Sequence, residues 1–132
     1  MNVESEHPQN ILVLDDIEET RDLTEKMLGR DGCRITLARN EEDAIARARS
    51  ESPDLILMSL GSELEQLLAT AERIRQKAAF GEDVVIVIFC VSCIPEGAEL
   101  EVNKNMYVTW PDNFDQLRKF LHRLLQHHAS TC

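Results

Sequence analysis

Short runs of apolar residues alternate along the chain with stretches in which apolar residues recur at helical spacing. Three of the runs, at residues 11–14, 55–58 and 84–89, are unbroken, which is typical of central parallel strands covered on both faces. Two further short runs, at residues 35–38 and 107–109, mix apolar and polar residues. The pattern therefore predicts five strands.

Stretches with helical spacing lie between these strands. Residues 17–28 predict a first helix. Its buried face is expected to comprise Ile17, Leu23, Met27 and Leu28. Asn40 precedes three acidic residues, a start that suits the positive end of a helix. Residues 63–77 place five apolar side chains on one helical face, and Asn113 with Gln116 predicts the capped start of a last helix.

The segment at residues 94–105 interrupts this alternation. Its position after the fourth strand suits a helix, but it contains Pro95, Gly97 and two asparagines, which lower helix propensity. We expect a short or irregular fourth helix in this segment.

Strand and helix thus alternate five times, which predicts an α/β fold with a five-stranded parallel sheet, doubly wound with helices on both faces. In such sheets the functional site lies beyond the carboxyl ends of the strands. The candidate site residues at those ends are Asp15, Asp16, Ser59, Phe89, Cys90 and Trp110.

Length and charge narrow the classes of function. A chain of 132 residues, 43% of them hydrophobic, forms one domain with one core. Its 24 acidic and 14 basic residues give a formal charge of -10, which repels phosphate backbones and anionic membranes, so we expect no nucleic-acid or membrane partner. The longest apolar run, at residues 84–91, is far shorter than the roughly 20 residues of a membrane span.

The two ends of the chain are polar. We expect a disordered tail at residues 1–9, a domain at residues 10–128 and a C-terminal tail at residues 129–132. Because the first residues lack an apolar signal region, a cytoplasmic location with reduced cysteines is expected. We interpret His127 and His128 as part of a solvated terminus rather than as metal ligands.

The strand ends resemble those of bacterial response-regulator receiver domains, the CheY-like family of two-component signal transduction. The resemblance spans about residues 10–127. It rests on the acidic pair Asp15 and Asp16 after the first strand, on the sequence PDLILM before Ser59, and on the sequence YVTWP that begins at Tyr107. It implies a flavodoxin-like sheet in the order 2-1-3-4-5 and a role in a phosphorelay rather than as an enzyme.

The chain departs from this family at the residues that carry the chemistry. The family has a phosphoacceptor aspartate where Ser59 stands, a Ser or Thr near Phe89 or Cys90, and a lysine where Trp110 stands. A serine hydroxyl needs a base that an ionised aspartate does not need, and the missing lysine removes a cation that would neutralise phosphoryl oxygens. We therefore interpret the site as degenerate, with Trp110 covering the former pocket and Tyr107 at the family's aromatic switch position.

The acidic pair is a candidate for a residual cation site. Asp15, Asp16 and the carbonyl of Gly61 would offer oxygen ligands to a weakly held Mg²⁺, which prefers a fuller octahedral set. The alternative interpretation is a solvated turn at the end of a strand. No other cofactor is expected.

The favoured hypothesis is a pseudo-receiver that binds a kinase or another signalling protein without phosphorylation, through the fifth strand and the last helix, or that pairs as a homodimer. On the last helix a basic cluster either is solvated or docks an acidic partner. This cluster comprises Arg118, Lys119 and Arg123.

Two alternative functions remain open. Cys90 and Cys93 form a CxxC motif after a strand, which is either a thiol redox switch or a pair of apolar packing residues. The other alternative is a Mg²⁺-assisted receiver that is phosphorylated at a different residue, such as Ser62.

Overall fold

The computed structural model describes the backbone of residues 9–130 and the side chains of residues 9–126. The expected N-terminal tail therefore lies almost wholly outside the described residues, as do residues 131–132 of the expected C-terminal tail. The side chains of His127 and His128 also lie outside them.

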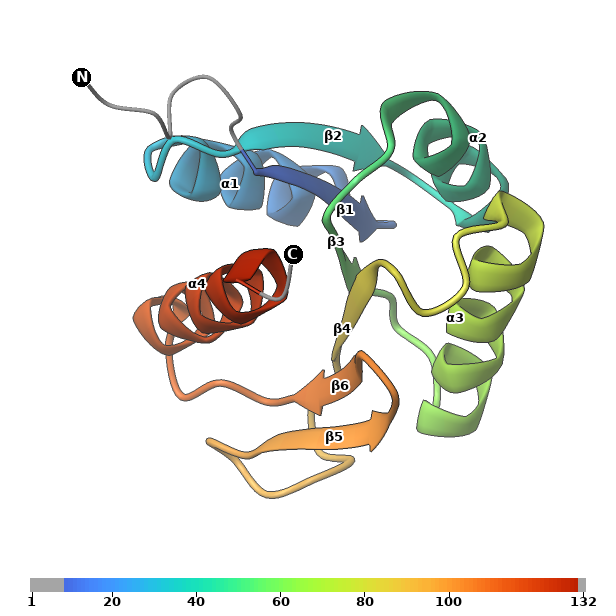
Figure 1. The fold of residues 1–132 in the computed structure, drawn as a ribbon. Helices are drawn as coiled ribbons and strands as arrows, with labels where there is room; N and C mark the ends of the chain where they lie inside the picture. The colour runs from blue at the N-terminus through green and yellow to red at the C-terminus, as the bar shows by residue number, and fades with distance from the viewer. Residues whose placement is uncertain (1–8, 131–132) are drawn as a thin grey trace.

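Six strands form a single sheet in the order β2-β1-β3-β4-β6-β5 (Figure 1). The strands are β1 (Asn10–Asp15), β2 (Arg34–Ala38), β3 (Leu55–Ser59), β4 (Val85–Phe89), β5 (Glu99–Asn103) and β6 (Met106–Thr109). All neighbours pair in parallel except β5 and β6, which are antiparallel. The predicted α/β fold is thus confirmed, and the five parallel strands have the expected order.

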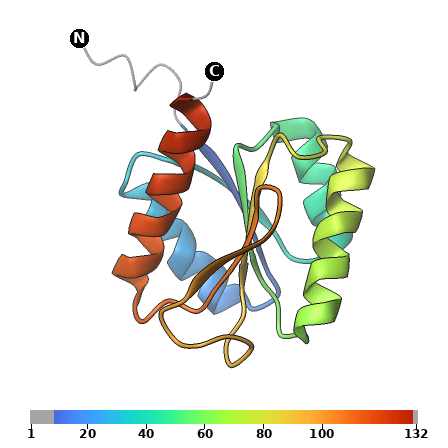
Figure 2. The ribbon, with the colours of Figure 1, turned by 60° about the horizontal axis from the view of Figure 1, so that its bottom comes forward.

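Four helices cover the sheet. They are α1 (Glu18–Gly29), α2 (Glu41–Glu51), α3 (Leu64–Ala78) and α4 (Phe114–Ser130). Helices α1 and α4 lie on one face, and α2 and α3 lie on the other (Figure 2). No helix among residues 9–130 is long and apolar enough to cross a bilayer.

The unbroken apolar runs form the central strands because both of their faces are buried. In β1, Leu12 and Leu14 belong to the core layer that includes α2 and α3, whereas Ile11 and Val13 belong to the layer that includes α4. This division follows from the alternation of side chains along a strand. Both layers are needed for the central strands to exclude water.

The expectation of a short or irregular fourth helix at residues 94–105 is wrong. The segment contains β5 instead, an antiparallel strand at the edge of the sheet. Gly97 has a φ of +87°, a conformation that favours glycine, and a Cβ there would lie in a tight contact, 3.3 Å from the Asp112 carboxylate. Asn105, with a φ of +54°, makes the turn into β6, and asparagine tolerates this left-handed conformation. These two turns leave only a short stretch, which pairs as a strand.

The predicted helix starts are confirmed at α2 and α4. Asn40 Oδ1 accepts a hydrogen bond from the Asp43 amide at 2.8 Å, and Asn113 Oδ1 accepts one from the Gln116 amide at 2.9 Å. The predicted buried face of α1 is wrong in part, because Ile17 and Leu23 are 55% and 56% exposed. Helix α1 therefore packs chiefly through its carboxyl-terminal half.

Candidate functional site

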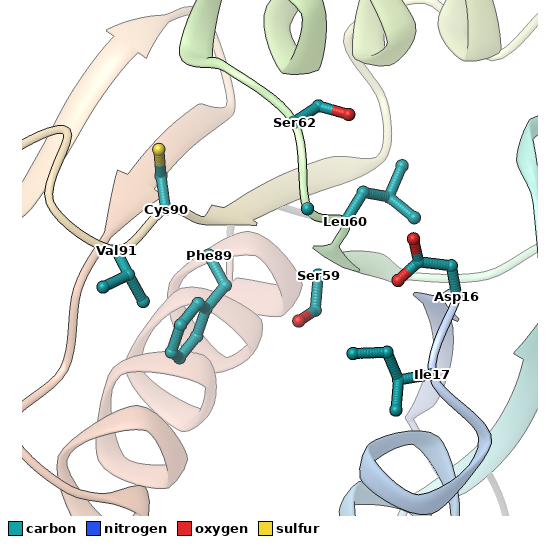
Figure 3. Close-up of a pocket in the computed structure, with 9 residues that line it drawn as sticks. Asp16, Ile17, Ser59, Leu60, Ser62, Phe89, Cys90 and Val91 are labelled. Atoms are coloured by element: carbon teal, nitrogen blue, oxygen red, sulfur yellow. The ribbon is translucent and has the colours of Figure 1, made fainter.

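The carboxyl ends of β1, β3 and β4 meet at a pocket with a volume of about 250 Å³ (Figure 3). Parallel strands deliver their carboxyl ends to one edge of a sheet, so the pocket lies where such folds place ligands. It is lined by Asp16, Ile17, Ser59, Leu60, Gly61, Ser62, Phe89, Cys90 and Val91. Six of these residues were candidates from the sequence, namely Asp16, Ser59, Gly61, Ser62, Phe89 and Cys90.

Ser59 occupies the end of β3. It is half-buried and pairs in register with Asp15 of β1. Figure 3 shows it between Phe89 and Asp16. The pocket therefore presents a hydroxyl group at the position where the resemblance implies a carboxylate nucleophile.

The two members of the acidic pair lie in different environments. Asp15 is only 1% exposed, and its Oδ1 accepts a hydrogen bond from the Ile17 amide at 2.9 Å. Its Oδ2 is buried and has no hydrogen-bond partner among the described residues. Burial raises the pKa of Asp15, and the neighbouring charge of Asp16 acts in the same direction. Asp16 is exposed and lines the pocket, whereas Asp15 does not.

The donor set does not fit a Mg²⁺ ion. Of the residues that the structure describes, Asp16 is the only one that brings a carboxylate to the pocket, and the other oxygen donors there are the hydroxyls of Ser59 and Ser62 and backbone groups such as the Gly61 carbonyl. Mg²⁺ requires hard oxygen ligands in near-octahedral order. Among the described residues, no three His, Cys, Asp or Glu side chains are grouped for metal binding.

The wall formed by β4 is apolar. Phe89 and Cys90 line the pocket, and Cys90 is joined to Cys93 by a disulfide bond, whereas reduced cysteines were expected from the sequence. Cys90 is 4% exposed, while Cys93 is exposed in the loop after the strand. One sulfur of the bond thus belongs to a buried residue of the site and the other to a residue that solvent reaches.

Trp110 and Tyr107 lie outside the pocket. Trp110 is not among the lining residues, so the expected cover over the pocket is absent. Its backbone amide instead donates to the Ala98 carbonyl at 3.2 Å, which ties the end of β6 to the start of β5. The ring of Tyr107 contacts that of Phe120 in α4 edge to face, with 5.7 Å between centroids. Burial, and then the charge of Glu101, raises the pKa of Tyr107.

The basic cluster on α4 is engaged within the chain. Arg118 forms two hydrogen bonds with the Asp31 carboxylate, at 2.9 and 3.1 Å. The Arg118 guanidinium lowers the pKa of Asp31 by hydrogen bonding. Lys119 pairs with Asp115 at 3.1 Å, and Arg123 donates to Glu99 at 2.8 Å. These pairs account for the charge of the cluster and leave little to attract an acidic partner.

Three of the lining residues were not predicted from the sequence. Ile17, Leu60 and Val91 are apolar residues that follow strands β1, β3 and β4 directly or nearly so. The signal that would have found them is their position, because every residue just after a parallel strand lies at this edge.

The class of fold is the CheY-like α/β fold, with a sixth, antiparallel edge strand. No protein-family model and no curated protein sequence matches the chain. Chemotaxis protein CheY4 of Vibrio cholerae is 20% identical, with a TM-score of 0.67 over 89% of this chain and 98% of that chain.

Response regulator protein TrrA is also similar. TrrA from Thermotoga maritima in complex with Mg²⁺-BeF is 26% identical, with a TM-score of 0.66 over 88% of this chain and 98% of that chain. The structure of TrrA with histidine kinase ThkA gives 24% identity and a TM-score of 0.69 over 89% of this chain and 98% of that chain.

Proposed function

We propose that the chain is a receiver-like signalling domain that binds another protein of a two-component pathway without accepting a phosphoryl group. The observation that carries this proposal is the composition of the pocket. Ser59 stands at the end of β3, and none of the nine lining residues is basic. Similarity to receiver domains supports the class of domain, and the pocket supports the loss of its chemistry.

The physical argument concerns charge. An aspartate is ionised at neutral pH and attacks phosphorus directly, whereas a serine hydroxyl needs a nearby base. Asp16 is the one acidic side chain among the nine described residues that line the pocket, and it would repel an anionic phosphoryl donor unless a cation were bound. Transfer would therefore lack both its nucleophile and its charge stabilisation.

The proposed partner is a histidine kinase or another component of such a pathway. The structure of TrrA with histidine kinase ThkA supports this class of partner. In this chain we assign binding to β6 and α4, which are the fifth strand and the last helix expected from the sequence, and we extend it to the neighbouring edge strand β5. A homodimer through the same surface is the alternative.

Intact mass spectrometry after incubation with acetyl phosphate and Mg²⁺ tests the loss of chemistry. We expect no phosphorylated species in the parent chain. The double variant Ser59→Asp, Trp110→Lys shows whether the two family residues suffice to restore transfer and serves as the matched comparison. Stoichiometric phosphorylation of the parent would refute the proposal, and a phosphate mapped to Ser62 would support the alternative of a receiver that is phosphorylated at a different residue.

A thiol switch is a second candidate, supported by the Cys90–Cys93 disulfide at the pocket wall. Reduction by a dithiol would break the Sγ–Sγ bond, leave two thiols on the chain and oxidise the dithiol to its own disulfide. Cys93 is exposed and gives the reductant access. The loop between β4 and β5 would then gain freedom next to the pocket.

Cys93→Ser tests the switch, with Cys33→Ser as the control, because Cys33 is free and burial raises its pKa. We expect dithiothreitol to increase the parent mass by about 2 Da and to change Trp110 fluorescence, in the parent and in Cys33→Ser only. If parent and Cys93→Ser respond alike, the switch is refuted.

A further inference from the structure

Strand β5 ends the sheet and has no neighbour on its outer side among the described residues. Figure 1 shows it at the margin of the molecule, beyond β6. It replaces the helix that was expected in this segment. Leu100 and Val102 are 44% and 42% exposed. Leu100 is in register with Val108, whose side chain lies in the core layer of α2 and α3. The two residues therefore continue that face of the sheet without a helix to cover them.

The backbone of β5 can accept another strand. In an antiparallel ladder, alternate residues direct their N–H and C=O groups away from the paired strand. The pairing with β6 is regular from Glu99 to Glu101, and the irregularity falls beyond it, before Asn103. An exposed edge of this kind pairs with an extended peptide through main-chain hydrogen bonds.

The β5–β6 hairpin is held in place at both ends. Arg75 of α3 donates to the carbonyls of Lys104 and Asn105 in its turn, at 2.7 and 2.9 Å. At the other end, Glu99 accepts hydrogen bonds from Arg123 and Gln116 of α4, at 2.8 and 3.1 Å. Because the strand is already ordered, a partner would not have to order it on binding.

The negative charge of β5 and its flanking residues indicates which side chains a partner segment would carry. Residues 96–104 contain three glutamates and one lysine. Glu99 is paired with Arg123, whereas Glu96 and Glu101 are exposed and form no ion pair among the described residues. Opposite charges placed across neighbouring strands stabilise a sheet, and like charges destabilise it.

We propose that β5 binds an extended segment of a partner protein in which basic side chains alternate with apolar ones. The apolar side chains would cover Leu100 and Val102, and the basic ones would face Glu101. This inference rests on the proposed role in protein binding and names the partner's chemistry. A second copy of the chain fits less well, because two acidic β5 strands would meet and each chain carries a charge of -10.

A fluorescein-labelled peptide of alternating lysine and valine, about seven residues long, is the probe. Binding is followed by fluorescence anisotropy, and amide hydrogen exchange reports which strand becomes protected. We expect saturable binding with protection of β5 amides. A peptide with glutamate in place of lysine, and one with N-methylated alternate amides, should both fail to bind.

Two charge reversals localise the site. Glu101→Lys should weaken binding about fivefold, the effect of turning one cross-strand ion pair into a repulsion. Glu42→Lys makes the same change at an exposed position of α2, which lies near the opposite edge of the sheet from β5, and it should leave binding near the parent value. Leu100→Ser should weaken binding while leaving the charge unchanged.

Three outcomes would overturn the inference. The first is an equal loss of peptide affinity in Glu101→Lys and Glu42→Lys. The second is binding of the glutamate peptide as tight as that of the lysine peptide. The third is a dimer, seen by sedimentation, whose β5 amides are protected without peptide. If acetyl phosphate phosphorylated the chain while peptide binding stayed intact, the proposed loss of phosphoryl chemistry would be refuted and the inference about β5 would stand. The two failures are thus distinguishable.

Discussion

Replacing Arg75 by methionine tests how the β5–β6 hairpin is held. Arg75 is 4% exposed, and its Nη2 donates to the carbonyls of Lys104 and Asn105 at 2.7 and 2.9 Å. Burial lowers the pKa of its guanidinium, against the opposing charges of Glu72 and Glu82. The side chain is therefore a buried cation that is held mainly by two backbone carbonyls of one turn.

The loss of stability expected for Arg75→Met follows from these contacts. A hydrogen bond from a charged group contributes about 1.5–3 kcal/mol. Arg75 Nε has no partner, so the cost of desolvating the guanidinium offsets part of this gain. After Arg75→Met the Asn105 carbonyl still accepts from the Ile86 amide at 2.9 Å, and only the Lys104 carbonyl loses the donor described for it. We expect a loss of about 2 kcal/mol in the free energy of unfolding.

Urea unfolding followed by Trp110 fluorescence measures this loss, and amide hydrogen exchange locates it. Arg73→Met is the matched control, since Arg73 lies on the same helix but binds Glu41 at the surface. The control should lose much less stability, because exposed ion pairs contribute little. Faster exchange should be confined to β5 and β6 in Arg75→Met. A loss no larger than that of Arg73→Met would refute the anchoring role.

Three further predictions concern the core and two carboxyl groups. Leu12→Ala removes a fully buried side chain of β1 and should cost about 2–5 kcal/mol, against under about 0.5 kcal/mol for exposed Leu23→Ala, both measured by urea unfolding. Asp31 has a lowered pKa because Arg118 binds its carboxylate. Its contribution to the free energy of unfolding is therefore present above the unfolded pKa and is lost as the pH falls through the folded pKa. Asp31→Asn should reduce the loss of stability on acidification. Asp15 has a raised pKa, so its ionisation destabilises the fold as the pH rises, and Asp15→Asn should gain in melting temperature at pH 7 but not at low pH. These assignments would be contradicted if Asp31→Asn lost as much stability on acidification as the parent, or if Asp15→Asn had no higher melting temperature at pH 7.

The parallel part of the fold could be predicted because its signals are local. The central strands are apolar on both faces, and the caps at Asn40 and Asn113 are formed by side chains only three residues from their amides. The predicted helix at residues 94–105 failed because its position in the alternation was given more weight than its own pattern. Glu99–Asn103 alternates polar and apolar residues, which is the period of a strand with one exposed face.

Contacts of Asp15 and Trp110 explain why these two predicted site residues do not line the pocket. Position at a strand end was enough to place Asp16, Ser59 and Phe89 at the pocket. It was not enough for Asp15, which pairs in register with Ser59 but is buried, with its Oδ1 bonded to the Ile17 amide. Nor was it enough for Trp110, whose backbone amide donates to the Ala98 carbonyl next to β5. Residues beyond the last strand pair need tertiary contacts to set their direction, and these contacts come from segments distant in sequence.

The edge strand and the altered pocket support each other as parts of one proposal. A receiver that signals through phosphorylation must change the shape of its binding surface when the pocket is occupied. The β5–β6 hairpin is instead fixed by contacts that do not involve the pocket, from Arg75 on one side and from Arg123 to Glu99 on the other. A surface that is always formed suits a pocket without phosphoryl chemistry, because binding then depends on the presence of the partner rather than on a switch in this chain.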